Sequence, residues 1–428
     1  MYLLLKPENW LLPLTLLSYT GATTTFLQPI LGSNARWLFT VLLFVLLFSR
    51  FNMRGLLSTR FSHIVFINLA WAALTIIWSE VPVLSAMKVI AYCLVAVTFF
   101  YASYLWVMQS HVTRTIDFLW ASTVTTFIAA IGGLASPAGN VNTGASVLYQ
   151  GLVAGPNMMA SLLMMCTPLL VWRCYINWDK MSLRIFWLSC IGIEFIFLLK
   201  ANSRAALVAS ILCCISIVYS LGVRKWVPIV TSLLLLVPTL LLISPVIYEL
   251  AVEKYVFKNA SEKQGVLYTR ATVWEESYRL AKLGGWTGGG YGVTIGDDSF
   301  QAGLTSVGYG REKGNSQMAI VEEMGLVGLG FYILMFVTLY AYQLKMFFLS
   351  KNIELRVLLG ISMGIITGMV FQSIFEAWWV APGSPEFVYF WTLIGFSIGV
   401  CQLIRQDMMK QFKMNAHKAQ KERELKHA

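Results

Sequence analysis

Charge is scarce in this sequence: only 12% of its 428 residues are Asp, Glu, Lys or Arg, whereas 57% are hydrophobic. A typical soluble domain has about 25% charged and about 45–50% apolar residues. This composition excludes two or three soluble domains, which the length alone would allow. Apolar runs of about 18 residues or more recur along almost the whole chain, and each could cross a bilayer core of about 30 Å.

We therefore predict an all-α polytopic membrane protein with about twelve transmembrane helices. The apolar runs are too long, and their alternation too weak, for an outer-membrane barrel. The first run is followed by others and lacks a small-residue cleavage site, which argues against a removed signal peptide. The predicted spans cover residues 10–31, 36–50, 61–79, 86–108, 115–135, 158–176, 183–199, 203–221, 227–249, 317–343, 355–375 and 383–404.

Lys and Arg are unevenly distributed between the two sets of connecting segments, and this bias predicts the orientation. The short outer loops carry only Arg36, Lys200 and Arg204, so both termini are expected in the cytoplasm. The net charge of +11 is mostly this topology signal together with a basic tail near anionic headgroups, and nucleic-acid binding is not expected. The inner segments carry Lys6, Arg50, Arg54, Arg60, Arg114, Arg173, Lys180, Arg184, Arg224, Lys225, Lys345, Lys351 and Arg356.

Histidine is almost absent, and all four histidines fall on cytoplasmic segments or their edges: His63, His111, His417 and His427. The outer face therefore has no histidine for general-base chemistry or for metal binding, so a proton acceptor there must be a carboxylate. None of the seven cysteines lies in an outer loop, and no spaced metal-binding set occurs. Asp297 and Asp298 have no third acid or histidine nearby, so no metal site is expected.

The chain divides into four parts. Residues 1–247 hold nine spans and a short polar outer loop at 136–157, and residues 317–404 hold three more spans before the basic tail, 405–428. Between them, residues 248–316 form one large outer loop. Within this loop the spacing from Thr269 to Gly285 predicts an amphipathic helix, and the stretch from Gly284 to Asp298 is too rich in glycine for a helix or strand.

Cations gather at the outer face. Arg204 opens an apolar helix beside Lys200, where an exposed helix N-terminus and a guanidinium suit a phosphate or diphosphate. The alternative is an arginine that only marks the membrane interface. The large loop adds more cations, of which Arg270 and Arg279 could instead be ordinary surface charges paired with Glu275 and Glu276. The loop cations are Arg270, Arg279, Lys282, Arg311 and Lys313.

Three acids lie near the same face. Glu322 and Glu323 are about two turns into the span at 317–343, and Glu376 follows the span at 355–375. Acids at such depth are candidates for function. The alternative is a structural salt bridge to Arg204 or Arg270.

Several motifs resemble the O-antigen ligase/polymerase family, the bacterial Wzy-like membrane glycosyltransferases. The match covers residues 150–330 in order and spacing. Its motifs are "GLVAGPN" (Gly151 to Asn157), "SRAAL" from Ser203, "RATVWEES" from Arg270, "GGGYG" from Gly288, and "GNSQMAIVEEMGLVG" from Gly314.

The resemblance implies a GT-C-like helical fold in the bacterial inner membrane that performs metal-independent glycosyl transfer at the periplasmic face. The implied donor is a glycan on undecaprenyl diphosphate, with no cofactor. A chain-length-regulating membrane protein and an export machinery are the implied partners. Arg204 and Arg270 match the family's arginines and would bind the diphosphate, whose charge grows as it leaves.

This chain departs from the ligases of the family at one dipeptide, which bears on the acceptor. Ligases of this family carry a His–Asn pair where this chain has Gly314–Asn315. We therefore expect a polymerase of exopolysaccharide, capsule or O-antigen repeat units rather than a ligase. The segment from Glu376 to Trp391 is similar to exopolysaccharide polymerases and offers aromatic rings for stacking on sugars.

The expected roles are as follows. Glu322, Glu323 or Glu376 activates the acceptor hydroxyl. Arg204, Arg270, Arg279, Arg311 and Lys200 contact the diphosphate, and Asn157, Asn315, Trp274 and Trp379 shape the glycan cleft. The alternatives are a ligase that has replaced its base and a transporter or flippase, although transporters usually place charges or helix breaks at mid-bilayer.

Overall fold

Helices make up most of the structure, as predicted. The computed structural model describes residues 6–23, 34–52, 59–109, 116–142, 147–221, 268–296 and 313–427. Within these ranges nine helical segments are long and apolar enough to cross a membrane. They are α5 (Arg60–Leu74, continued by a 3-10 turn to Trp78), α6 (Pro82–Gln109), α8 (Asp117–Gly132, continued to Ala135), α9 (Pro156–Ile176), α10 (Met181–Ala201), α11 (Arg204–Leu221), α15 (Ser316–Leu349), α16 (Ile353–Gln372) and α17 (Pro385–His427).

The remaining three predicted spans are not among these nine segments. α1 (Glu8–Thr23) and α3 (Ala35–Arg50) have 16 residues each. At 1.5 Å per residue α3 is about 24 Å long, which is shorter than a bilayer core of about 30 Å, and the described part of α1 has the same length. The predicted end of the first span and the whole span at 227–249 lie outside the described residues.

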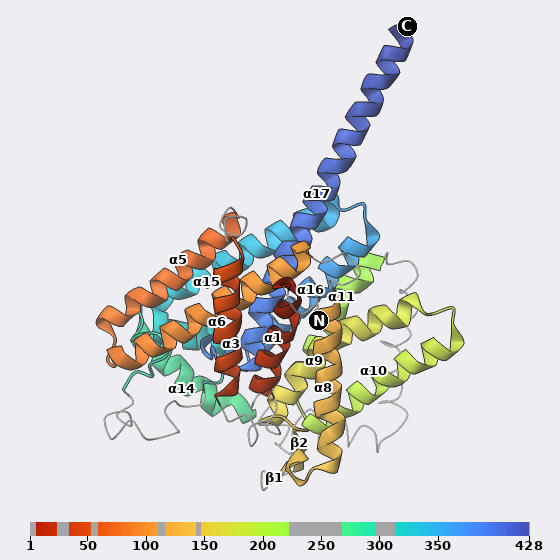
Figure 1. Ribbon diagram of the computed structural model, residues 1–428. Coiled ribbons are helices and arrows are strands. Elements are labelled where there is room, and N and C mark those ends of the chain that lie inside the picture. Colours follow the sequence, from red (N-terminus) through yellow and green to blue (C-terminus); the bar gives the residue numbers. More distant parts are fainter. Residues whose placement is uncertain are drawn as a thin grey trace.

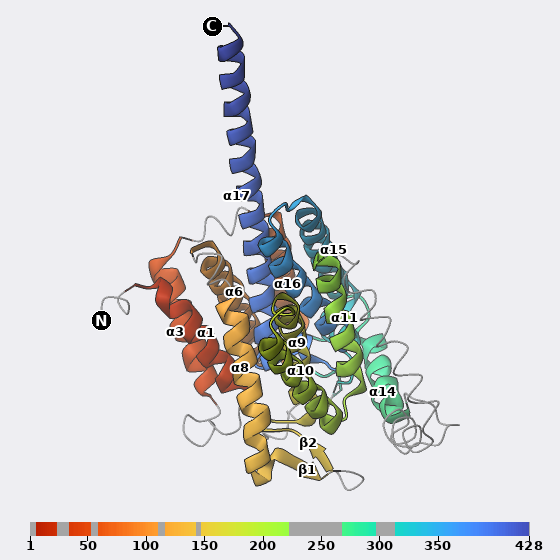
Figure 2. The same cartoon turned by 90° about the vertical axis from the view of Figure 1, so that its right-hand side faces the viewer.

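The helices pack side by side in one bundle, and α17 extends far beyond one end of it (Figures 1 and 2). The opposite end carries α14 (Tyr268–Gly284) and a small hairpin of β1 (Asn140–Asn142) and β2 (Val147–Tyr149). Short links join α9 to α10, α10 to α11 and α15 to α16, so these neighbours run antiparallel. We call the end with α14 and the hairpin the loop end, and the other end the tail end.

The most buried helices are α16 and α17, in which 72% and 89% of the most apolar stretch is buried. α17 packs against α6, α16 and α15, and α16 packs against α11. By contrast only 17% of the corresponding stretch of α10 is buried. Such a helix, apolar on its open faces, suits contact with lipid rather than water.

Basic residues of the predicted inner segments lie at the tail end. Arg173 is in the last turn of α9, Arg356 is in the first turn of α16, and both of these helix ends point to the tail end of the bundle. Arg405 lies on α17 on the way to the basic tail. The assignment of this end to the cytoplasm stays a prediction.

Two predicted loop features are confirmed within the described residues. α14 spans Tyr268–Gly284, where the amphipathic helix was expected, and residues 285–296 contain neither helix nor strand. The short loop at 136–157, predicted only as small and polar, contains the hairpin, in which Asn140 pairs with Tyr149.

Candidate functional site

The site begins with a break in α15. Gly325 has φ 72° and ψ −178°, so the helix is interrupted directly after Glu322, Glu323 and Met324. The backbone groups that the break frees are bonded by the glycine-rich segment that follows α14. The N–H groups of Gly289 and Gly290 donate to the carbonyls of Glu322 and Glu323 at 2.9 and 3.0 Å.

The far side of the break is bonded in the same way. Leu326 N–H donates to Gly285 O at 2.9 Å, and Val327 N–H donates to Trp286 O at 3.2 Å. A Cβ on Gly325 would stand 2.1 Å from Trp286 O, which no side chain tolerates. A broken helix within a membrane protein requires protein partners for its freed backbone groups, and the glycine run provides them.

Glu322 and Glu323 lie at this break and are almost fully buried, with side chains 0% and 2% exposed. Lys313 Nζ lies 2.6 Å from Glu323 Oε1 and 3.4 Å from Glu322 Oε2. The second oxygen of Glu323 accepts the Gly292 N–H at 2.7 Å. We call Lys313, Glu322 and Glu323 the buried triad. The salt bridges that the structure shows thus join both acids to a lysine of the large loop, whereas arginine partners were expected.

A second carboxylate cluster joins three separate elements. Glu376, in the turn after α16, accepts hydrogen bonds at Oε1 from Arg270 Nη2 of α14 at 2.6 Å and from Asn157 Nδ2 of α9 at 2.8 Å. The Arg270 and Glu376 side chains are 20% and 26% exposed. We call these three residues the open triad. The salt bridge between Arg270 and Glu376 is the structural alternative considered for these two residues, and it lies at the edge of a cavity.

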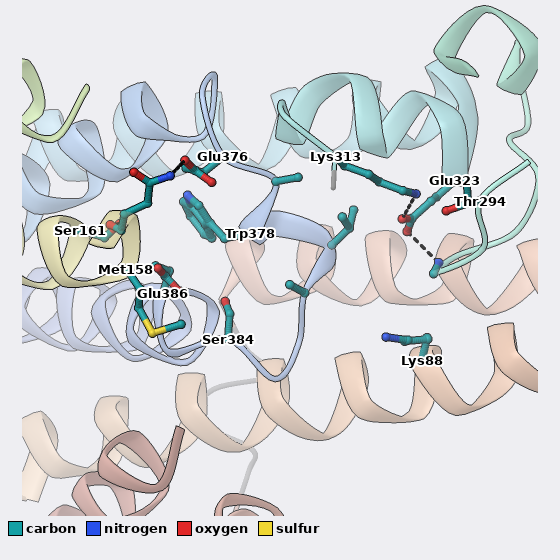
Figure 3. A pocket seen from close by; sticks show the side chains of 15 residues that line it. Lys88, Met158, Ser161, Thr294, Lys313, Glu323, Glu376, Trp378, Ser384 and Glu386 are labelled. Atoms are coloured by element: carbon teal, nitrogen blue, oxygen red, sulfur yellow. Dashed lines mark hydrogen bonds and ion pairs between the residues drawn. The ribbon is translucent and has the colours of Figure 1, made fainter. Parts of the chain in front are cut away.

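A cavity of about 390 Å³ lies between the two triads (Figure 3). It brings together Asn157 and Glu376 from the open triad and Lys313 and Glu323 from the buried triad. Its polar lining is completed by residues from α6, α9, the glycine-rich segment, the turn before α17 and α17 itself. These additional polar residues are Lys88, Ser161, Thr294, Ser384 and Glu386, and Trp378 contributes an aromatic wall.

Lys88 was missed by the sequence analysis. It lies in the second turn of α6 and is half-buried. No hydrogen bond or ion pair joins its ammonium to another of the described residues, and Figure 3 shows it pointing into the cavity opposite the Lys313–Glu323 pair. A lysine within an apolar run was the available signal, because charges at such positions are uncommon without a function.

Next to the cavity, α3, α6 and the turn before α17 enclose an apolar groove of about 780 Å³. Leu84, Met87 and Ile90 of α6 form one wall, and Met87 and Ile90 are 62% and 66% exposed. Arg36 at the start of α3 donates from Nη1 to Gly383 O at 2.9 Å, and this bond closes the groove at the loop end. The groove and the cavity share Lys88, Met158, Ala381 and Ser384.

Three predicted glycan contacts are absent from the cavity lining and contact other parts of the structure. Asn315 is the N-cap of α15, where Oδ1 accepts the Met318 N–H at 2.8 Å and Nδ2 donates to Ile374 O at 2.9 Å. Trp274 donates to Gly314 O at 3.1 Å. Trp379 stacks on Tyr332 at 5.4 Å, away from the cavity lining.

The neighbouring Trp378 lines the cavity in place of Trp379. Its ring is 5% exposed, and its indole N–H has no hydrogen-bond partner among the described residues. The sequence "EAWWVAP" does not separate the two tryptophans, because a 3-10 turn at Trp378–Val380 decides which ring faces the cavity.

Three predicted cations, Arg204, Lys200 and Arg279, are absent from the cavity lining. Arg204 is half-buried at the start of α11, and Lys200 lies 5.8 Å from the Tyr149 ring. Arg279 is 60% exposed and forms two hydrogen bonds with Glu276, the surface pair considered for it. These bonds raise the pKa of Arg279. Arg311 lies outside the described residues.

No group of three or more His, Cys, Asp or Glu within the described ranges could hold a metal ion. Comparison with known proteins adds no assignment: no protein-family model matches this chain, and no curated protein matches it.

Proposed function

We propose that this protein is a polysaccharide polymerase of the bacterial inner membrane. It would join undecaprenyl-diphosphate-linked glycan repeat units at the periplasmic face by metal-independent glycosyl transfer. The observation that carries the proposal is the junction at Lys88, where a polar cavity meets an apolar groove. An amphiphile with an anionic head and a long apolar chain has complementary chemistry to both compartments.

The head group would lie in the cavity. Lys88, without an ion pair among the described residues, is placed to bind the diphosphate, and Arg270 can exchange its bond to Glu376 for a phosphate oxygen. Ammonium and guanidinium groups stabilise the charge that grows on a leaving diphosphate. The resemblance implies that Arg204 also binds the diphosphate, and Arg311 and Lys200 stay predicted contacts of it.

The glycan would lie along the other wall of the cavity. Trp378 offers an aromatic face and a buried indole donor, and Asn157 and Ser161 offer polar groups from α9. An apolar wall with a few placed polar groups is the usual composition of a small-molecule site. The apolar chain would follow the groove between α3 and α6, whose exposed side chains open toward lipid.

The environment of Gly314 supports a polymerase rather than a ligase. A Cβ on Gly314 would stand 2.5 Å from Val273 Cγ1. A histidine at this position, which ligases of the resembled family carry, would therefore require the Val273 side chain or the loop to shift.

The helix break in α15 is the one feature that would suit a transporter, because transporters often place broken helices at a substrate site. Here the freed backbone groups of residues 322–327 bond to the glycine-rich segment rather than facing a central path. The break also lies only nine residues after the start of α15 at Ser316, beside the loop end.

The test is reconstitution of the purified protein with a synthetic lipid-diphosphate repeat unit and no other acceptor. A polymerase converts this donor into a ladder of products that differ by one repeat, and chelation of divalent cations leaves the ladder unchanged. Products only after addition of a different glycolipid acceptor would indicate a ligase. Movement of intact donor across the vesicle membrane without a new glycosidic bond would indicate a flippase.

A further inference from the structure

Three carboxylates line the cavity: Glu323, Glu376 and Glu386. Two of them are held in salt bridges, Glu323 with Lys313 and Glu376 with Arg270. An oxygen that is bonded to a cation is less available to accept a proton from a substrate. Glu386 differs, since the described residues form no ion pair with it.

Two hydroxyl groups and the N-terminus of α17 interact with the carboxyl of Glu386. It is the second residue of α17, it is 7% exposed, and the hydroxyls of Ser161 and Ser384 interact with its carboxyl and favour its charged form. Ser384 Oγ also accepts the Phe387 N–H at 3.2 Å, which fixes the first turn of the helix. The N-terminus of a long helix favours a negative charge, so Glu386 can be ionised without a paired cation.

The surroundings of Glu386 suit a sugar. In Figure 3, Trp378 lies between Glu376 and Glu386, and Met158 and Ser384 flank Glu386. A ring stacked on Trp378 would therefore have a hydroxyl directed to Glu386. Lys88, Lys313, Glu323 and Glu376 are the other charged groups of this cavity, and Tyr19 of α1 interacts electrostatically with Glu386.

We propose that Glu386 is the proton acceptor for the acceptor sugar. This inference rests on the proposed polymerase function. The acceptor oxygen attacks the anomeric carbon of the donor and forms the new C–O bond, while its proton passes to the Glu386 carboxylate. The bond between the anomeric carbon and the phosphate oxygen breaks, and the diphosphate leaves with the bonding electron pair. Glu386 then releases the proton to water.

The experiment compares wild type, Glu386→Gln, Glu386→Asp and a matched control, Glu354→Gln. Glu354 is also an acid in the first turn of a long helix, α16, but it is exposed at the tail end. Each purified protein receives the lipid-diphosphate donor with either a sugar acceptor or azide. Azide is a nucleophile that carries no proton to remove, so its attack does not need Glu386.

We expect Glu386→Gln to lower turnover with the sugar acceptor by about 100-fold or more, the usual contribution of a general base. Its formation of glycosyl azide stays within about threefold of wild type under the same donor saturation, Glu386→Asp recovers part of the sugar transfer, and Glu354→Gln matches wild type.

A Glu386→Gln protein that transfers to the sugar acceptor as fast as wild type would overturn the inference. Equal losses with sugar and with azide would also overturn it, because they would mean that the substitution disturbs the site rather than proton transfer. Failure of the proposed function has a separate outcome, in which wild type itself forms no glycosidic bond from the donor.

Discussion

The buried triad and the open triad have the same chemistry, a carboxylate held by a cation from the large loop, but different environments. Lys313, Glu322 and Glu323 are at most 9% exposed and lie where the glycine-rich segment bonds to the break in α15. Arg270 and Glu376 are 20% and 26% exposed at the edge of the cavity. The first triad fastens the loop to the bundle, whereas the second can exchange partners.

This difference follows from the cost of desolvation. A charge buried without its partner is strongly unfavourable, so the members of the buried triad depend on one another. The open triad keeps contact with solvent, and a phosphate can replace Glu376 as the partner of Arg270 at a smaller cost. Burial therefore assigns a structural role to one triad and a binding role to the other, and substitutions can test that division.

The largest expected effect is on stability, from Lys313→Met. It leaves two adjacent buried carboxylates without their cation, and loss of one member of a buried pair typically costs about 3–5 kcal/mol. We expect a lower yield of folded protein and a much lower midpoint of thermal unfolding in detergent. Lys282→Met, at an exposed position of α14, is the control and should unfold like wild type. Equal midpoints for both variants would contradict the structural role of the buried triad.

The next effect is on activity, from Arg270→Ala. Loss of a charged donor to the leaving group should lower polymer formation by about 100-fold or more while the unfolding midpoint changes little. The matched control is Arg279→Ala on the same helix, whose pair with Glu276 lies in solvent and whose loss should change activity less than about twofold. If the two variants have equal activity, the open triad is not a binding site.

Lys88→Met tests the junction of the cavity and the groove independently of the two triads. An ammonium bonded to phosphate contributes about 1.5–3 kcal/mol, so we expect the donor KM to rise by about 10–100-fold. Lys88→Arg keeps the charge and should retain most of the affinity. A donor KM that is unchanged in Lys88→Met would mean that the diphosphate does not bind at this position.

The smallest effect is expected from Asn157→Ala, which deletes the hydrogen bond from Asn157 Nδ2 to Glu376 Oε1. A loss of about 1 kcal/mol corresponds to roughly a fivefold drop in polymer formation. Asn157→Asp should be worse, because it places a second carboxylate against Glu376. A steady-state assay on both variants checks this order, and the reverse order would mean that Asn157 does not orient Glu376.

The helical class, most span positions and α14 were predictable, because hydropathy and helical spacing are local properties. The break at Gly325 was not, since "EEMGLVG" is compatible with a continuous helix and only the contact with residues 285–290 interrupts it. The same long-range packing explains why Trp379 and Asn315 were predicted in the cleft and Trp378, Lys88 and Glu386 were missed. The residue types at the site were visible in the sequence, but the side from which each faces the cavity depends on partners hundreds of positions away.

The central claim is that a lipid diphosphate binds where the polar cavity meets the apolar groove. The most direct measurement is a structure of the protein with bound undecaprenyl diphosphate. We expect phosphate oxygens within about 3 Å of Lys88 Nζ and of the Arg270 guanidinium, with the isoprenoid chain along Leu84, Met87 and Ile90 of α6. A diphosphate bound away from both cations, or a chain outside the groove, would contradict the account.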